Sequence, residues 1–349
     1  MVASMLDFSG EVTYHLKCQT KPSEPQTASR AVLQRRILIM SKVLITESVH
    51  AKGPELLKKA GHKVVMVNRD MDQIQKEIVD ADAVFVRILE LPGSLLSTAK
   101  NLKIISKHGV GYDNIDMEYC KEHGIAVTIA PGANSLSVAE HAFALMMTLA
   151  KNIIPVSKAY KEIGFAAKNS KEGMEITGKT VGVIGIGRIG SHFAKMCHGF
   201  GTEVIAYDPY VTEAPEGVTL VDNLETLLKQ ADIISLHANL TDETRKMINA
   251  ERLAAMKPGV ILINCARGPI VDEPALIEAL KSGRIAAAGL DVTDPEPISP
   301  DNELLKMPNV IVTPHYAPTT LEAAIRVSTV AAQNIVSYLA GEEPVGRLI

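Results

Sequence analysis

Several features that would direct a protein to a membrane, a nucleic acid or a metal are missing from this chain of 349 residues. Its apolar stretches fall short of the ~18 residues that a membrane span needs. No run of five like charges occurs and the formal net charge is −4, so neither a nucleic acid nor an anionic membrane is an expected partner. The four cysteines lack the spacing of a metal or redox motif, so we expect no metal site and a reducing, cytoplasmic location.

The first 39 residues lack sustained hydrophobic periodicity and include Pro22 and Pro25. They contain no clean apolar core followed by a cleavage site, and their acidic residues argue against a mitochondrial transit peptide. Met40 then opens the run MSKVLIT, which is typical of a natural start leading into a first strand. We therefore expect residues 1–39 to form a disordered extension of a globular body.

Beyond this extension, short β-branched runs alternate with helical patterns in units of ~20–25 residues, which is typical of doubly wound parallel sheets of the α/β class. One group of strands is predicted at 43–46, 64–67, 83–86, 103–106 and 126–129. A second group is predicted at 180–184, 203–207, 233–236, 260–264, 286–290 and 310–313. Helices are predicted at 54–60, 71–79, 94–99, 135–151, 188–200 and 321–339.

The helix predicted at 135–151 has too few polar residues to lie on a free surface. It could cross between two domains or lie in a subunit interface. Ser135 is its candidate N-cap.

The strongest cofactor motif is the run Gly185-Ile186-Gly187-Arg188-Ile189-Gly190, which directly follows an apolar strand and opens a helix. Its glycines permit a tight turn, close approach of a pyrophosphate and close packing of helix on strand. Asp208 lies 18 residues beyond Gly190, at the end of the next predicted strand. An acid there can accept hydrogen bonds from ribose hydroxyls and repels a 2′-phosphate, so the motif favours NAD over NADP. An ordinary turn followed by a surface acid is the less favoured interpretation.

Three apolar strands of the second group lead into reactive side chains, namely Arg267, Glu296 and His315. Open α/β sheets bind ligands at the carboxyl ends of their strands. Arg267 can grip a carboxylate with two hydrogen bonds. His315 can transfer a proton near neutral pH, and Glu296 can stabilise its charged form. Each residue alone is more often structural, but the three together behind a dinucleotide motif point to catalysis.

With these motifs the chain resembles the D-isomer-specific 2-hydroxyacid dehydrogenases from about Lys42 to the C-terminus. The resemblance rests on residues 108–116 (HGVGYDNID), 134–141 (NSLSVAEH), the glycine loop, 264–268 (NCARG), 291–297 (DVTDPEP) and 313–315 (TPH).

The resemblance implies a role for each of the residues in these motifs. Arg267 would bind substrate, His315 would be the acid/base, and Glu296 would pair with it. Backbone groups of Val110 and Gly111 would receive the substrate carboxylate. The residues implied to lie along NAD are Gly185, Gly187, Arg188, Ile189, Gly190, Asp208, Cys265, Ala266 and Asp291, with Asp291 at the nicotinamide amide.

The resemblance also implies two doubly wound domains with the active site in a cleft between them. Residues 40–138 and 317–349 would form a flavodoxin-like substrate domain, and residues 139–316 a Rossmann NAD-binding domain. The long helix after Ser135 would build a homodimer interface. Two positions depart from the family pattern: Tyr316-Ala317 follows His315 where a small residue and glycine are common, and Cys265 replaces a commoner Thr, Ala or Ser. We expect Cys265 to be a packed position and not a nucleophile.

The predicted function is hydride transfer between NAD(H) and a small D-2-hydroxy acid or its 2-keto partner. Hydroxypyruvate, 3-phosphohydroxypyruvate and pyruvate remain open as substrates. Arg87, after the third strand, could meet a second anionic group, whereas Ile88 and Leu89 would tolerate an alkyl tail. The main alternative is a non-catalytic NAD-binding scaffold of the corepressor type on the same fold. An enzyme using bound NAD for hydrolysis would need other residues at the strand ends.

Overall fold

The computed structural model describes residues 40–349. The predicted disordered extension, residues 1–39, lies outside the described residues. Within the described range, no helix is both long and apolar enough to cross a membrane.

A first parallel sheet is built from the five strands of the first group, in the order β2-β1-β3-β4-β5. Its strands are β1 (Lys42–Ile45), β2 (Lys63–Met66), β3 (Ala83–Val86), β4 (Ile104–Lys107) and β5 (Ala126–Thr128). The helices around it are α1 (Lys52–Lys59), α2 (Met71–Glu77), α3 (Gly93–Leu96), α4 (Met117–Glu122) and α11 (Leu321–Leu339). This strand order is that of flavodoxin-like sheets, as the sequence predicted.

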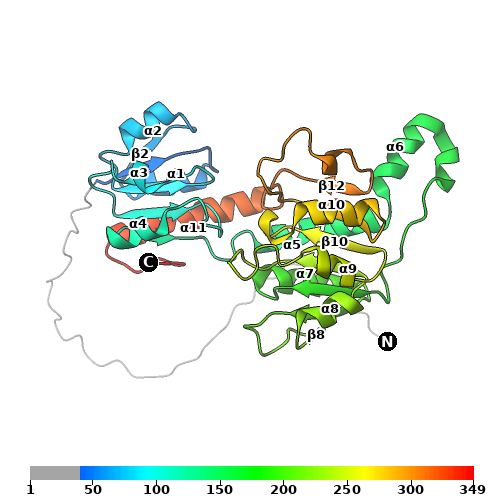
Figure 1. Cartoon of the computed structure of the whole chain (residues 1–349). Helices are drawn as coiled ribbons and strands as arrows, with labels where there is room; N and C mark the ends of the chain where they lie inside the picture. Colours follow the sequence, from blue (N-terminus) through cyan, green and yellow to red (C-terminus); the bar gives the residue numbers. More distant parts are fainter. Residues whose placement is uncertain (1–39) are drawn as a thin grey trace, which may run out of the picture. The chain divides into compact units, whose positions relative to one another are not determined.

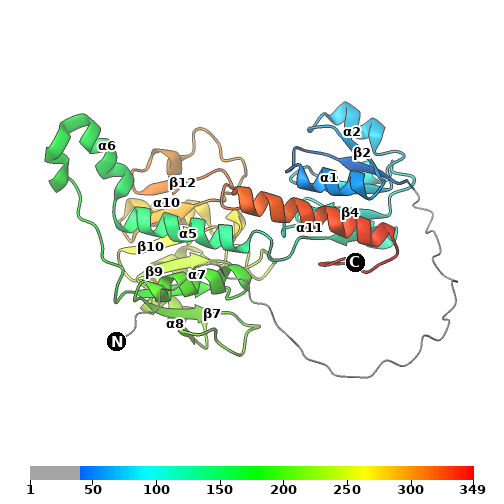
Figure 2. The same ribbon diagram turned by 180° about the vertical axis from the view of Figure 1, so that it is seen from behind.

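Alternation along the strands gives this sheet two apolar faces. Leu44, Val84 and Ile105 face the core that includes α2, α3 and α4. Val43, Phe85 and Ile104 face the opposite core, which receives Leu57 of α1 and Ala331, Ala332 and Ile335 of α11. Figures 1 and 2 show α11 running beside α1, although some 260 residues separate them in sequence. The C-terminal helix is therefore part of the first sheet's core.

The second sheet has seven parallel strands in the order β12-β11-β10-β9-β6-β7-β8. They are β6 (Thr180–Ile184), β7 (Glu203–Tyr207), β8 (Val218–Leu220), β9 (Ile233–Leu236), β10 (Val260–Asn264), β11 (Ile285–Leu290) and β12 (Val310–Val312). The order reverses between β6 and β9, and doubly wound sheets bind ligands at such a point. Both sheets confirm the predicted fold class.

Helices cover both faces of the second sheet. One face packs against α5 (Ser135–Ala150) and α7 (Arg188–Gly199). The other packs against α8 (Leu224–Gln230), α9 (Ala250–Ala255) and α10 (Glu273–Lys281). The remaining segments are α6 (Ile153–Ile163) and the short 3-10 helices Gly164–Asn169, Gly268–Ile270 and Glu303–Lys306.

The sequence prediction differs from the structure in three respects. Ser135 is the first residue of α5 and not its cap, because Asn134 occupies the N-cap position without a side-chain hydrogen bond. Several short or irregular elements were missed, namely β8, α4, α6, α8, α9 and α10. The other bounds agree or differ by one or two residues, apart from the end of α3, which lies three residues before the predicted end. The domain boundaries at 138/139 and 316/317 stay a prediction.

Candidate active site

The predicted glycine loop connects β6 to α7, and two of its glycines are required by close backbone contacts. Gly185 has φ +89°, and a Cβ on it would lie 2.7 Å from the Ala238 nitrogen. A Cβ on Gly190 would lie 2.1 Å from the Gly185 carbonyl oxygen, so α7 can approach β6 only through glycine. Gly187 has open space where its side chain would be. This combination of a tight turn and an accessible helix start fits the pyrophosphate of a dinucleotide.

The Asp208 carboxylate lies against the glycine loop. Its Oδ2 accepts a hydrogen bond from the Ile186 N–H at 3.0 Å, and its Oδ1 accepts one from the Tyr210 N–H at 3.0 Å. Because a carboxylate has about four acceptor positions, capacity remains for a ribose hydroxyl. Asp208 therefore both fixes the loop and stays available to a ligand.

Arg188 and Ile189 begin α7, where the sequence predicted contacts with a pyrophosphate. Arg188 is exposed, whereas Ile189 is partly buried against the core shared by α5 and α7. Exposure leaves the Arg188 side chain accessible to an anion at the helix N-terminus.

Cys265 and Ala266, predicted to lie along the cofactor, follow β10 and are both buried. The Ala266 N–H donates to Asn264 Oδ1 at 3.0 Å, which shapes the turn toward Arg267. Burial raises the pKa of the Cys265 thiol well above its usual range, so the group is an unreactive thiol and not a nucleophile.

Arg267 contacts the loop that follows β4. Its Nε donates to Asp113 Oδ2 at 3.0 Å, and its Nη1 donates to the Ala266 carbonyl at 2.7 Å. A Cβ built on Gly111 would lie 1.7 Å from Arg267 Nη2, so a larger residue there would displace the guanidinium. Arg267 and Gly111 are thus brought together, as the resemblance implied. Asp113 was not singled out, although it lies inside the quoted 108–116 motif.

The loop around Gly111 has backbone donors available for a ligand. Among residues 40–349, no acceptor lies within hydrogen-bond distance of the Val110 and Gly111 N–H groups. Gly109 has φ +142°, which favours glycine at the start of this turn. Two free N–H groups beside a guanidinium can bind a carboxylate.

Glu296 and His315 form the expected pair. Glu296 Oε1 lies 2.7 Å from His315 Nδ1, and both side chains are a little over 40% exposed. With Nδ1 engaged by a carboxylate, Nε2 is left as the nitrogen that can exchange a proton with a ligand. The carboxylate stabilises the imidazolium when His315 is protonated.

Asp291 holds the loop that carries His315. It is 1% exposed, and its carboxylate accepts hydrogen bonds from Thr313 Oγ1 at 2.5 Å, the Tyr316 N–H at 2.7 Å and the Ala317 N–H at 2.9 Å. The structure therefore gives Asp291 a positioning role, while its nicotinamide contact stays a prediction. In the sequence, Thr313 follows an apolar strand, and nothing there indicated its hydrogen bond to Asp291.

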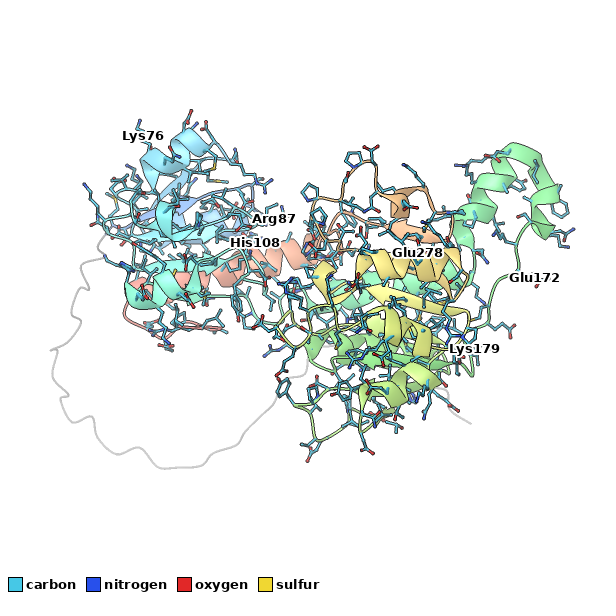
Figure 3. The ribbon with its side chains drawn as sticks, in the orientation of Figure 1. Lys76, Arg87, His108, Glu172, Lys179 and Glu278 are labelled. Atoms are coloured by element: carbon cyan, nitrogen blue, oxygen red, sulfur yellow. The ribbon has the colours of Figure 1, made fainter. Side chains whose placement is uncertain are left out.

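Arg87 follows the carboxyl end of β3, and its backbone N–H and carbonyl groups both make hydrogen bonds there. Its N–H donates to Oε2 of the buried Glu47 at 2.6 Å, and its carbonyl accepts from Lys107 Nζ. The exposed side chain lines a pocket of about 310 Å³ together with Arg69. Figure 3 labels Arg87 and His108, which follow neighbouring strands of the first sheet.

Two largely buried basic side chains, Lys107 and His108, adjoin this region. Burial lowers the pKa of Lys107 to about 8, against the opposing attraction of Glu47. Burial also lowers the pKa of His108 to about 4, and the nearby positive charge of Arg87 acts in the same direction. Because Lys107 Nζ already donates to the Arg87 carbonyl and Asn114 Oδ1, it supports the loop.

Comparisons with known proteins agree with this geometry. Residues 143–317 match the sequence model of the D-isomer specific 2-hydroxyacid dehydrogenase, NAD binding domain. A hydroxypyruvate reductase of Thermotoga maritima is 42% identical over 287 residues, which cover 81% of this chain and 93% of that protein. A D-3-phosphoglycerate dehydrogenase of Archaeoglobus fulgidus is 43% identical over 305 residues, 86% of this chain but 58% of that protein. The chain thus spans about three-fifths of the phosphoglycerate dehydrogenases it matches.

Among solved structures, a D-lactate dehydrogenase from Aquifex aeolicus complexed with NAD and lactic acid superposes with a TM-score of 0.78. It is 35% identical, and the match covers 86% of this chain and 96% of that one. The match to the NAD-binding domain confirms the predicted cofactor. On these grounds the chain belongs to the D-isomer-specific 2-hydroxyacid dehydrogenase family.

Proposed function

We propose that the protein is an NAD-dependent oxidoreductase that interconverts a small D-2-hydroxy acid and its 2-keto acid. The observation that carries the proposal is the 2.7 Å contact between Glu296 and His315. It is supported by Arg267, whose guanidinium lies next to Gly111, and by the Val110 and Gly111 N–H groups, which donate no hydrogen bond within residues 40–349. An acid/base and a carboxylate-binding cluster are the two groups that this chemistry requires.

In the reducing direction, each residue has a defined task. Arg267 and the Val110 and Gly111 N–H groups bind the substrate carboxylate and orient the adjacent carbonyl. NADH, which the glycine loop and Asp208 would hold, would supply the hydride. His315 donates a proton from Nε2 to the forming alkoxide, while Glu296 stabilises the imidazolium beforehand. Arg267 also stabilises the negative charge that develops on the carbonyl oxygen.

The substrate that we propose carries a second anionic or strongly polar group. Arg87 and Arg69 line the same pocket as Glu47, which pairs with Arg69 Nε at 3.1 Å. Two guanidinium groups and one carboxylate leave a net positive charge there, which would attract a phosphate or carboxylate. The names of the relatives, D-3-phosphoglycerate dehydrogenase and hydroxypyruvate reductase, agree with this class. We therefore rank 3-phosphohydroxypyruvate and hydroxypyruvate above pyruvate.

The experiment is the decay of NADH absorbance with a panel of 2-keto acids, on the wild type and on His315→Gln and Arg267→Ala variants. We expect turnover in the wild type and a loss of at least about a hundredfold in kcat for His315→Gln. NADH binding, measured by fluorescence, should persist in both variants because neither residue lies in the glycine loop. NADH binding without turnover of any acid would favour the NAD-binding scaffold of the corepressor type.

We also propose that the protein acts as a homodimer that is assembled through α5 and α6. Helix α6 has no buried residue in the described chain, and a short isolated helix is only marginally stable in water. It exposes Ile153, Ile154, Tyr160 and Ile163, each more than half accessible. A second copy of the same arm is the simplest cover, because a two-fold interface is self-complementary.

The cytoplasmic location stays a prediction. It is supported by Cys120, Cys197 and Cys265, which are buried free thiols.

A further inference from the structure

Two side chains on the same face of α5, Ser137 and His141, contact the loop that carries His315. Ser137 and His141 are four residues apart, so they lie one above the other on α5. Ser137 Oγ donates to the Ala317 carbonyl at 2.7 Å. His141 Nε2 lies 3.0 Å from Thr313 Oγ1. The two contacts hold the chain two residues before and two residues after His315.

The direction of each hydrogen bond follows from the acceptors present. The Asp291 carboxylate can only accept when it is ionised, so the Thr313 hydroxyl donates to its Oδ1. The Thr313 oxygen is then free to accept from His141 Nε2–H, which fixes the His141 tautomer. His141 Nε2 is also 3.5 Å from Asp291 Oδ1. A continuous chain of hydrogen bonds therefore runs from α5 through Thr313 to Asp291, which in turn binds the Tyr316 and Ala317 N–H groups.

The backbone of His315 needs such support. Its φ is +52°, in the left-handed region that residues other than glycine rarely occupy. A conformation of this kind persists only when its surroundings determine it. The His315 N–H donates to the Asp291 carbonyl at 2.8 Å, and in this conformation its Nδ1 meets Glu296 Oε1.

We propose that Ser137 and His141 are positioning residues, and that they form a two-point clamp from α5 that keeps His315 in its proton-transferring orientation. The proposal rests on the proposed role of His315 as acid/base. The clamp acts through the backbone and through Asp291, so it fixes the direction of the imidazole without contacting the substrate. Tyr316 also packs against the clamp, because its ring lies edge-on to the His141 ring, with 6.1 Å between the ring centroids.

The first test compares His141→Leu, His141→Gln and Ser137→Ala by steady-state kinetics. Leucine removes the Nε2 donor, and we expect kcat to fall by roughly tenfold while the KM of the keto acid and the Kd of NADH stay within about twofold. Glutamine can place an amide N–H near the same point and should restore most of kcat. Glu140→Ala, an exposed neighbour on the same helix, is the control and should retain the wild-type kcat. Equal kcat in the leucine and glutamine variants would overturn the proposal.

A double variant, Ser137→Ala with His141→Leu, tests whether the two contacts act together. Residues that stabilise one loop conformation couple, so the combined loss in kcat should differ from the product of the single losses by severalfold. Thermal melting separates this effect from a general loss of stability. If the losses in kcat are strictly multiplicative and follow the losses in melting temperature, both residues have only a packing role.

A second readout does not need turnover. In protein labelled with nitrogen-15 histidine, the Nδ1–H proton of His315 that faces Glu296 gives a strongly deshielded resonance, assigned by its loss in His315→Gln. We expect this resonance to shift or broaden in the double variant and to return in His141→Gln. An unchanged resonance in the double variant would contradict the clamp. Turnover of no 2-keto acid would contradict the proposed function, and this spectrum would still test the clamp.

Discussion

Glu296 contacts His315 through one carboxylate oxygen, so charge and hydrogen bonding can be separated by a single substitution. In Glu296→Gln the size is retained and the charge is lost. Because only the carboxylate stabilises the imidazolium, kcat/KM for keto-acid reduction at pH 7 should fall by about five- to tenfold. Hydroxy-acid oxidation begins from the neutral imidazole and should lose less. Initial rates in both directions measure the difference, and an equal loss in each would contradict the pairing.

Asp208 combines two tasks at one carboxylate. Asp208→Asn retains one acceptor oxygen for the Ile186 or Tyr210 N–H but removes the negative charge. Since the charge repels a 2′-phosphate, the ratio of kcat/KM for NADPH over NADH should rise by about tenfold or more. Asp208→Ala, which also frees the loop, should lower the melting temperature as well. An unchanged cofactor preference in both variants would show that this acid does not discriminate.

Arg87 is a favourable residue for a specificity test because its structural bonds are made by its backbone. The N–H to Glu47 and the carbonyl to Lys107 survive in Arg87→Ala. We expect kcat/KM for 3-phosphohydroxypyruvate to fall by about ten- to a hundredfold, because a bidentate charged contact is lost. Pyruvate, which lacks a second anion, should be affected by less than about threefold. Equal losses in kcat/KM for the two acids would show that Arg87 supports the loop and does not bind a second anionic group.

At the scale of elements, α6 is the only α-helix among residues 40–349 that has no buried residue. Its apolar side chains are exposed, although α5 next to it is largely buried. Figures 1 and 2 show α6 extending away from the second sheet's other helices. An exposed apolar surface of this kind usually marks an interface.

The corresponding prediction concerns oligomeric state. Ile154→Glu with Ile163→Glu places two charges on the apolar surface of α6 and should convert the proposed dimer to a monomer at micromolar concentration. Light scattering coupled to size-exclusion chromatography measures the mass directly. The control Lys158→Glu alters an exposed polar position of the same helix. A wild type that is monomeric at high concentration would refute the proposed assembly.

Elements could be predicted from the sequence where periodicity was strong. Except for β8, the strands of both sheets were recognisable, as was the helix at 321–339, because β-branched runs and long apolar spacing leave a clear pattern. Helices such as α8 and α9 are so short that their apolar periodicity spans few residues, although Asn223 and Asn249 cap them. Ser135 failed as a cap because Asn134 precedes it in the helix-start position. Local pattern alone could not decide between them.

For the molecule as a whole, acid should reduce stability through buried histidines. Burial lowers the pKa of His237 to about 3 and of His108 to about 4, from 6.5 in the unfolded chain. As the pH falls below 6.5 the unfolded chain takes up protons that the folded chain does not, so the free energy of unfolding decreases. Between pH 6.5 and 5 the loss should be on the order of 1–2 kcal/mol per histidine.

Denaturant unfolding between pH 6.5 and 5 measures the slope of the free energy of unfolding against pH. His237→Gln can keep a contact to Ser235 while removing the titrating ring, and its slope should be smaller than that of the wild type. Carboxylates with lowered pKa values, such as Asp232, act below this window. A slope identical in wild type and variant would show that His237 does not titrate on unfolding.

The site as a whole was only partly predictable. Arg267, Glu296 and His315 could be found because reactive residues after apolar strands are rare, and the glycine loop because its spacing is specific. The supports Ser137, His141, Thr313 and Glu47 could not, since each acts through contacts between residues more than 20 positions apart. A sequence pattern describes neighbours along the chain, whereas these contacts exist only after the sheets have formed.

The return of α11 to the first sheet bears on how this protein is made. Ala331, Ala332 and Ile335 complete one face of a core whose other members, such as Val43 and Ile45, leave the ribosome nearly 300 residues earlier. During synthesis, that face of the sheet stays exposed until α11 is translated. At ~5–20 residues per second, the wait is on the order of 15–60 seconds. Of the two sheets, the first therefore begins to be synthesised earlier and is completed later, and during that interval chaperones could bind its uncovered face.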